Sequence, residues 1–200
     1  MLDKYRQKAD SILEPIARKI SLEANLLTYL SFIFAIIAGI TAYFSFERKW
    51  LLLPTSLFIL MNGFFDALDG KIARMKGKAD KRGDFIDHTI DRFSDVFIIG
   101  GIIASKWVEK EIGIIAMASM LLVSYLGTQA QAVGYKRVYS GILGRADRII
   151  ILFIACIIQF LIINKIFGFY FMEWAMFYFI IAGIATILQR YFAVMKWFKE

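Results

Sequence analysis

The chain has 200 residues, room for about one domain, and 59% of them are hydrophobic, with a mean hydropathy of +0.61. It also carries 24 basic and 17 acidic residues and one cysteine. The high hydrophobic content excludes a disordered or collagen-like chain, and a single cysteine excludes a disulfide scaffold. The charges fall between long apolar runs. A net charge of +7 in that pattern is typical of basic loops beside anionic lipid headgroups, so we expect a membrane protein and no nucleic-acid partner.

Six apolar runs approach the roughly 20 residues that a helix needs to cross a bilayer. They cover residues 26–46, 50–68, 93–107, 112–133, 149–163 and 169–188, and the third extends back to residue 84. The runs are continuously apolar rather than alternating, which argues against membrane strands. The pattern predicts an all-α integral membrane fold with six transmembrane helices. We expect one domain over 1–200, with the six-helix bundle over 26–192.

Residues 3–20, before the first apolar run, have apolar side chains at helical spacing with Lys and Arg between them. The apolar positions are Tyr5, Ala9, Ile12, Leu13, Ile16 and Ile20. This pattern predicts an amphipathic helix within 1–22 that lies in the cytoplasmic interface of the membrane. The alternative is an ordinary polar leader to the first span.

The distribution of Lys and Arg predicts the orientation in the membrane. Eighteen of them lie in the two terminal segments and in loops 69–82 and 134–148, against five in the intervening loops. Because cytoplasmic loops carry the excess of basic residues, we expect a multi-pass protein of the cell membrane with both termini cytoplasmic.

Carboxylates stand in or beside two of the apolar runs, at Asp66, Asp69, Asp84, Asp87, Asp91 and Asp95. The last four are three, four and four residues apart, so they form one stripe on a helix. Charges at membrane depth are costly and indicate function. Protons, Arg or Lys, or divalent cations would neutralise them, and we favour a Mg²⁺ or Mn²⁺ site, possibly binuclear. The alternative is a solvated helix end, above all for Asp84 and Asp95.

The spacing of these acids resembles a known signature. The segment Asp66-Ala-Leu-Asp69-Gly70-Lys-Ile-Ala73-Arg74, followed by Gly83, Asp87 and Asp91, is similar to D-x2-D-G-x2-A-R-x8-G-x3-D-x3-D of the CDP-alcohol phosphotransferase family. The resemblance implies metal-dependent transfer of a phosphatidyl-type group from a CDP-linked lipid to an acceptor hydroxyl, with release of CMP. It also implies a homodimer.

The same resemblance assigns roles by motif position. Asp66, Asp69, Asp87 and Asp91 would bind metal, and Asp91 would also be the general base. The nucleotide would contact a second set of residues: Asn25, Thr28, Asp69, Gly70, Ala73, Arg74 and Gly83. His88, beside Asp87 and near Asp91, would form hydrogen bonds that support the metal ligands rather than act as the base.

A basic stretch before and within the fifth span predicts the acceptor. Lys136, Arg137, Arg145 and Arg148 resemble the stretch in family members that use inositol phosphate, which implies a phosphorylated polyol such as inositol 1-phosphate. The alternative is that these charges serve only the membrane orientation. Those relatives often read A-R-A-E just upstream, where this chain has Thr128-Gln129-Ala130-Gln131. The lost Arg leaves glycerol 3-phosphate open, although the amides of Gln129 and Gln131 are candidate contacts to acceptor hydroxyls.

The donor and the protein class also have alternatives. CDP-diacylglycerol and CDP-archaeol both fit as donors. A small ion or proton carrier would use the same acids as a relay, but it would not need Gly70, Arg74 and Gly83 at their spacing.

Overall fold

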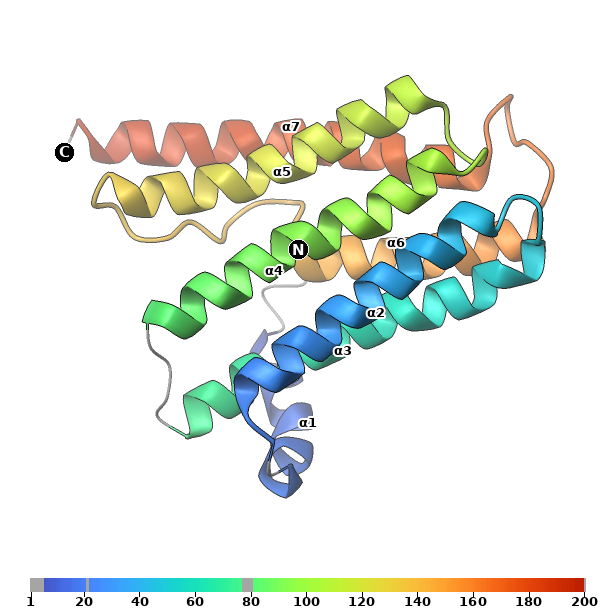
Figure 1. Ribbon diagram of the computed structural model, residues 1–200. Helices are drawn as coiled ribbons and strands as arrows, with labels where there is room; N and C mark the ends of the chain where they lie inside the picture. The colour runs from blue at the N-terminus through green and yellow to red at the C-terminus, as the bar shows by residue number, and fades with distance from the viewer. Residues whose placement is uncertain (1–5, 21, 77–80, 200) are drawn as a thin grey trace.

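The computed structural model describes residues 6–20, 22–76 and 81–199, with side chains described from residue 13 onward. The described chain forms seven α-helices and one short 3-10 helix and no extended strand, which confirms the all-α prediction (Figure 1). The helices are α1 (Arg6–Lys19), α2 (Ala24–Phe44), η2 (Lys49–Leu51), α3 (Leu52–Met75), α4 (Lys81–Ala104), α5 (Lys110–Ala132), α6 (Arg145–Leu161) and α7 (Phe171–Trp197).

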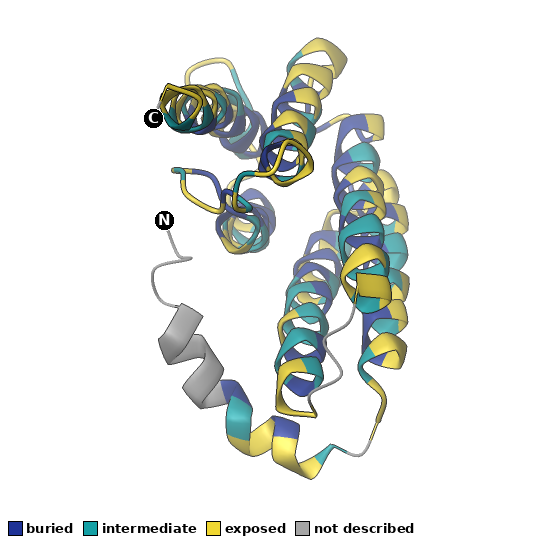
Figure 2. Ribbon diagram, turned by 90° about the vertical axis from the view of Figure 1, so that its left-hand side faces the viewer, coloured by how far each residue is buried: buried dark blue, intermediate teal, exposed yellow. Residues whose placement is uncertain are grey.

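The six long helices run back and forth, so that alternate helix ends meet at the same end of the bundle (Figure 1). Helix α2 packs between α3 and α4, α3 packs on α6, and α5 pairs with α7. Contacts of α4 with α5 and of α6 with α7 join these groups. Figure 2 shows that buried residues lie mainly on the faces that the helices turn toward one another. The C-terminal end of α3 and the N-terminal ends of α4 and α6 therefore face one another across one end of the bundle.

Helices α2 and α4 approach closely at a pair of glycines. A Cβ atom on Gly39 would overlap the backbone carbonyl of Phe97, and one on Gly101 would overlap the backbone of Gly39. Small residues at such a crossing let two helix backbones touch, which is a common way to pack helices in lipid. This contact fixes α4, with its acidic stripe, against α2.

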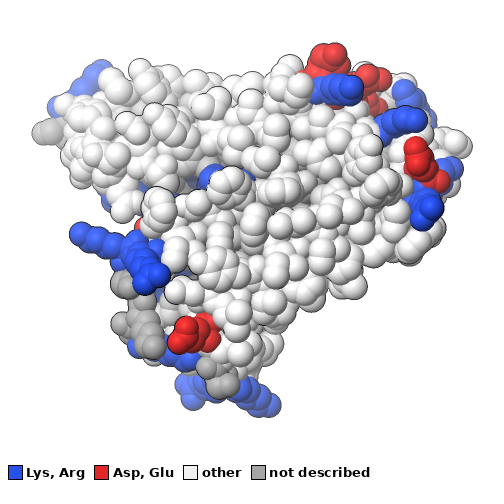
Figure 3. Space-filling model, viewed as in Figure 1, with Lys and Arg blue, Asp and Glu red and all other residues white. Residues whose placement is uncertain are grey.

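On the face shown in Figure 3, most Lys, Arg, Asp and Glu side chains lie toward the two ends of the molecule, and the band between the ends is nearly free of them. Four helical stretches of the described chain are long and apolar enough to cross a membrane: Ala24–Phe44, Lys49–Met75, Lys110–Ala132 and Phe171–Trp197. Helices α4 and α6 form as expected but fall short of that standard, because α4 carries the acidic stripe and α6 has only 17 residues. The count of six spans stays a prediction.

Helix α1 lies across the C-terminal end of α3 (Figure 1). Its Leu13 and Ala17 are buried against residues of α2 and α3, and Lys71 of α3 donates a hydrogen bond to Glu14 Oε2 at 3.2 Å. The predicted amphipathic helix is therefore present over residues 6–19, with part of its apolar face on the protein itself. Tyr5, and the side chains of Ala9 and Ile12, lie outside the described residues.

Candidate active site

Two helices bring four carboxylates together at one end of the bundle. Asp66 and Asp69 come from α3, and Asp87 and Asp91 come from α4. Carboxylate oxygens of Asp66, Asp69 and Asp87 lie within 4.8 Å of one another, and Asp87, His88 and Asp91 form a second such group. Clustered carboxylate oxygens suit hard divalent cations, so this donor set fits Mg²⁺ or Mn²⁺.

Arg145, at the start of α6, reaches into this cluster. Its Nη1 forms an ion pair with Asp66 Oδ1 and lies 2.5 Å from Asp91 Oδ1. Asp91 is buried, and its Oδ1 has no partner with hydrogen-bond geometry among the described residues. The arginine thus offsets part of the negative charge without saturating the carboxylates.

The second arginine of α6, Arg148, meets a different acid. Its Nη1 donates to Asp95 Oδ2 at 2.8 Å in a buried pair between α6 and α4. Arg92 Nε lies 3.6 Å from the same Asp95 oxygen, and Arg92 Nη2 lies 3.5 Å from Asp91 Oδ2. The two arginines of α6 therefore meet different acids: Arg145 meets Asp66 and Asp91, and Arg148 meets Asp95.

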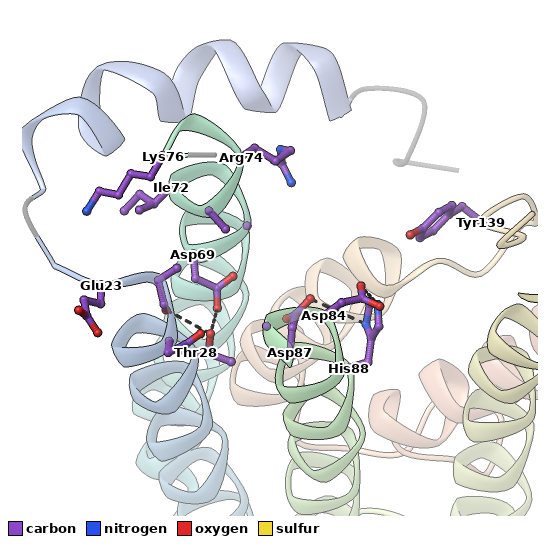
Figure 4. Close-up of a pocket in the computed structure, with 15 residues that line it drawn as sticks. Glu23, Thr28, Asp69, Ile72, Arg74, Lys76, Asp84, Asp87, His88 and Tyr139 are labelled. Carbon is purple, nitrogen blue, oxygen red and sulfur yellow. Dashed lines mark hydrogen bonds and ion pairs between the residues drawn. The ribbon is translucent and has the colours of Figure 1, made fainter. Parts of the chain in front are cut away.

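A cavity of about 380 Å³ opens beside the carboxylates (Figure 4). Every residue that the resemblance assigned to the nucleotide lines it: Asn25, Thr28, Asp69, Gly70, Ala73, Arg74 and Gly83. Thr28 Oγ1 donates to Asp69 Oδ2 at 2.5 Å, which holds that carboxylate toward α2. A Cβ atom on Gly70 would stand 3.2 Å from Arg74 Nη1, so the glycine leaves room for the guanidinium beside the cavity.

The loop between α5 and α6 reaches the edge of this cavity through Tyr139, another lining residue (Figure 4). In the same loop Arg137 contacts His88 Nε2, and its Nη1 lies 3.5 Å from Asp84 Oδ1. His88 Nε2 is also 2.9 Å from Asp84 Oδ1, while its Nδ1 is 3.8 Å from Asp87 Oδ2. Asp84 and His88 therefore tie the loop to α4 next to the carboxylate cluster.

Three residues predicted for the acceptor do not reach the site. Lys136 is exposed, with its Nζ 5.9 Å from the ring centroid of Tyr135, and it does not line the cavity. Gln129 and Gln131 are exposed near the C-terminal end of α5 and do not line it either. The contacts of these two amides with acceptor hydroxyls stay a prediction.

The residues that hold the loop between α5 and α6, which carries Lys136 and Arg137, were not predicted from the sequence. Arg190 of α7, which the charge pattern counts as a cytoplasmic surface residue, is buried and donates to Ser140 O at 3.0 Å and Val123 O at 2.5 Å. Thr186 Oγ1 accepts hydrogen bonds from the backbone N–H groups of Ile142 and Leu143. A basic residue after the last apolar stretch is the only hint, and it does not distinguish an anchor from a loop charge.

Known proteins are similar to this chain in sequence and in fold. Residues 22–187 match the CDP-alcohol phosphatidyltransferase family. The chain is 33% identical to an archaetidylinositol phosphate synthase of Methanothermobacter thermautotrophicus over 100% of this chain and 96% of the relative. A Pyrococcus horikoshii protein of the same name is 34% identical over 78% of this chain and 81% of its own length.

The fold also matches crystal structures of Mycobacterium tuberculosis phosphatidylinositol phosphate synthase, each 22% identical to this chain. One, with CDP-DAG bound, has a TM-score of 0.72 and aligns over 92% of this chain and 94% of its own. Another, with manganese and citrate, has a TM-score of 0.74 and aligns over 92% and 88%. The chain therefore belongs to the CDP-alcohol phosphatidyltransferase family, and it is a membrane transferase rather than an ion or proton carrier.

Proposed function

We propose that the chain transfers a phosphatidyl-type group from a CDP-linked lipid to a hydroxyl of inositol 1-phosphate, releasing CMP. The observation that carries this proposal is the juxtaposition of three elements: the carboxylate cluster, the cavity lined by the expected nucleotide residues, and an arginine of α6 that reaches the cluster. The names of the relatives from M. thermautotrophicus and P. horikoshii support the acceptor.

The carboxylate oxygens of Asp66, Asp69, Asp87 and Asp91 would hold Mg²⁺ or Mn²⁺, with two ions the favoured number. Bound there, the metal would polarise the diphosphate and offset the charge that develops on CMP. The crystal structure of the M. tuberculosis relative with manganese and citrate supports this choice of metal. Thr28 would hold the Asp69 carboxylate in place through its 2.5 Å hydrogen bond.

Other side chains of the site would bind the two substrates and take up the proton. Arg74 would grip the diphosphate in the cavity with its fork of N–H donors. Asp91 would take the proton of the acceptor hydroxyl. The hydroxyl oxygen would then attack the lipid-linked phosphorus, and the bond between that phosphorus and the bridging oxygen of the diphosphate would break, releasing CMP. Arg145 of α6 and Arg137 of the loop between α5 and α6 would bind the acceptor phosphate. Arg148 and Lys136 would lie farther from the carboxylate cluster.

Either CDP-diacylglycerol or CDP-archaeol would serve as the donor, and glycerol 3-phosphate is the alternative acceptor. We place the protein in the cell membrane with six spans, both termini cytoplasmic, and we expect a homodimer. The end of the bundle that carries the carboxylates would then face the cytoplasm, where CDP-lipid headgroups and phosphorylated polyols are found.

A direct assay tests this function. Purified protein in detergent is given each CDP-lipid with Mg²⁺ or Mn²⁺, and CMP release is followed in parallel with inositol 1-phosphate, glycerol 3-phosphate and serine. We expect metal-dependent release with inositol 1-phosphate and a lipid product of the corresponding mass. Release only with glycerol 3-phosphate would keep the chemistry and overturn the acceptor. Absence of release with every acceptor, from folded protein that binds metal, would contradict the proposal.

A further inference from the structure

Arg145 occupies a position that its own helix disfavours. It is the first residue of α6, and the positive end of a helix dipole repels a cation there. The helix start is nevertheless fixed, because Asp147 Oδ2 accepts from the backbone N–H of Gly144 at 2.9 Å and Thr186 Oγ1 accepts from that of Leu143 at 3.0 Å. What offsets the repulsion is the pair of carboxylates that the guanidinium meets on α3 and α4.

The guanidinium touches the atoms that a metal ion would use. Nη1 of Arg145 is paired with Oδ1 of both Asp66 and Asp91, and all three side chains are largely buried. A divalent ion bound to those oxygens at about 2.0–2.2 Å would repel a guanidinium nitrogen at the same atoms. Four carboxylates are also neutralised in full by two divalent ions, which leaves the charge of Arg145 in surplus.

The rest of the guanidinium has donors to spare. Nε and Nη2 of Arg145 are buried and have no hydrogen-bond partner among the described residues. Buried donors without partners are costly, and the planar fork of arginine matches phosphate oxygens. The side chain is therefore able to take a phosphate group when it leaves the carboxylates.

We propose that Arg145 is an internal cation that competes with a divalent metal ion for Asp66 and Asp91, and that metal binding releases its guanidinium to a phosphate group of the substrate. This inference rests on the metal site of the proposed function. It goes beyond that function by making metal binding and phosphate binding depend on each other through one side chain.

The test measures metal binding without turnover. Mn²⁺ is titrated into purified protein in detergent, and the ion that stays free is followed by its electron paramagnetic resonance signal. Arg145→Gln removes the competing cation, and Arg148→Gln is the matched control, because Arg148 is also a buried arginine in the first turn of α6 but pairs with Asp95. Arg145→Lys keeps the charge and is a second check, and gel filtration establishes that each variant is folded.

We expect Arg145→Gln to bind Mn²⁺ about tenfold more tightly than the wild type, because charge-assisted bonds to the carboxylates no longer compete. Arg148→Gln should change the affinity by less than about threefold, and Arg145→Lys should stay near the wild type. Equal tightening in both glutamine variants would reveal only a general charge effect and overturn the competition, as would no tightening in Arg145→Gln. No Mn²⁺ binding by any of these proteins would instead remove the metal site of the proposed function, and this inference with it.

A second arm identifies the phosphate. Inositol 1-phosphate or CMP is added separately to the Mn²⁺ titration, with protein-free controls for chelation. Since coupling between two ligands is reciprocal, the phosphate that takes Arg145 should tighten Mn²⁺ binding by about three- to tenfold in the wild type but not in Arg145→Gln. Tightening by inositol 1-phosphate assigns the guanidinium to the acceptor, and tightening by CMP assigns it to the nucleotide. Equal effects in wild type and variant would overturn the release of Arg145 to phosphate.

Discussion

Both ends of the bundle bury a carboxylate, and the two ends differ in how fully the carboxylate oxygens are hydrogen-bonded. At the end away from the candidate site, Glu173 of α7 is 1% exposed, and both its oxygens accept backbone N–H groups, from Glu109 at 3.2 Å and Tyr170 at 2.7 Å. Nearby, the indole of Trp107 donates to Ser45 Oγ at 3.0 Å. The polar groups of this end are paired with neighbours in a way that needs no ligand.

The opposite end leaves its buried polar atoms incompletely paired. Every buried side-chain nitrogen or oxygen that lacks a hydrogen-bond partner within the described chain belongs to α4 or α6, on Asp91, Arg92, Ser94, Arg145 and Arg148. Unpaired buried groups are rare in native proteins and cost stability. Burial alone therefore does not identify a functional acid in this protein. Buried polar atoms without a hydrogen-bond partner instead gather on α4 and α6, two helices that contribute to the candidate site.

The largest effect that the comparison predicts is on activity at the incompletely paired end. Asp91→Asn keeps the shape of the side chain but removes the proposed base, so CMP release should fall by about 10²- to 10⁴-fold. The control is Asp84→Asn, which changes a largely exposed carboxylate on the same helix and should cost far less. Equal losses in the two variants, measured as initial rates of CMP release, would show that Asp91 has no special role.

The paired end should respond in stability instead. Glu173→Ala leaves two partly buried backbone N–H groups without their acceptor, which should lower the free energy of unfolding by about 1–3 kcal/mol. The rate per folded molecule should stay within about twofold of the wild type. Thermal unfolding in detergent measures the first quantity, with Glu111→Ala, an exposed acid of α5, as the control. Normal stability with a lost rate would make Glu173 functional.

A glycine pair on α4 sharpens the role of the contact that holds this helix. Gly101→Ala would drive a Cβ atom into the backbone of Gly39, and the strain should cost about 1–3 kcal/mol. A Cβ atom on the neighbouring Gly100 meets nothing within 4 Å, so Gly100→Ala should be neutral or slightly stabilising. Similar unfolding temperatures for the two variants would contradict the close approach of α2 and α4.

The smallest effect should come from the ion pairs of α1. Hydrogen bonds from Arg18 and Lys71 lower the pKa of Glu14 below its ordinary value. A lowered pKa in the folded state means that the pairing stabilises α1 at neutral pH and is lost as the pH falls through the acidic range. Glu14→Gln should therefore raise proteolysis within α1 slightly at pH 7, and this difference between the variant and the wild type should shrink as the pH falls below the ordinary pKa of a glutamate. No difference at pH 7 would mean that packing by Leu13 and Ala17 alone holds the helix.

Much of the site was predictable because its spacing is local. Asp66 to Arg74 lie within three turns of α3, and Gly83 to Asp91 lie within three turns of α4, so the helical period fixes which side chains share a face. The cavity then contains the expected nucleotide residues because α2, α3 and α4 pack on one another as consecutive antiparallel helices.

The remaining part depended on contacts between distant segments. The contact of Arg145 with Asp66 and Asp91 follows from the docking of α6 on α3, which no local pattern encodes. Likewise Arg190 is a buried anchor rather than a loop charge, because α7 continues to Trp197, past the end of the apolar run. The exposure of Gln129 and Gln131 is set by how α5 is rotated against α7, and the sequence left that rotation open.

The most direct test of the account is to locate Mn²⁺ in crystals of the protein by its anomalous scattering. We expect density among the carboxylate oxygens of Asp66, Asp69, Asp87 and Asp91, with the guanidinium of Arg145 withdrawn from Asp66 and Asp91. Mn²⁺ bound elsewhere, or Arg145 still paired with both carboxylates while CMP release proceeds in the same conditions, would contradict it.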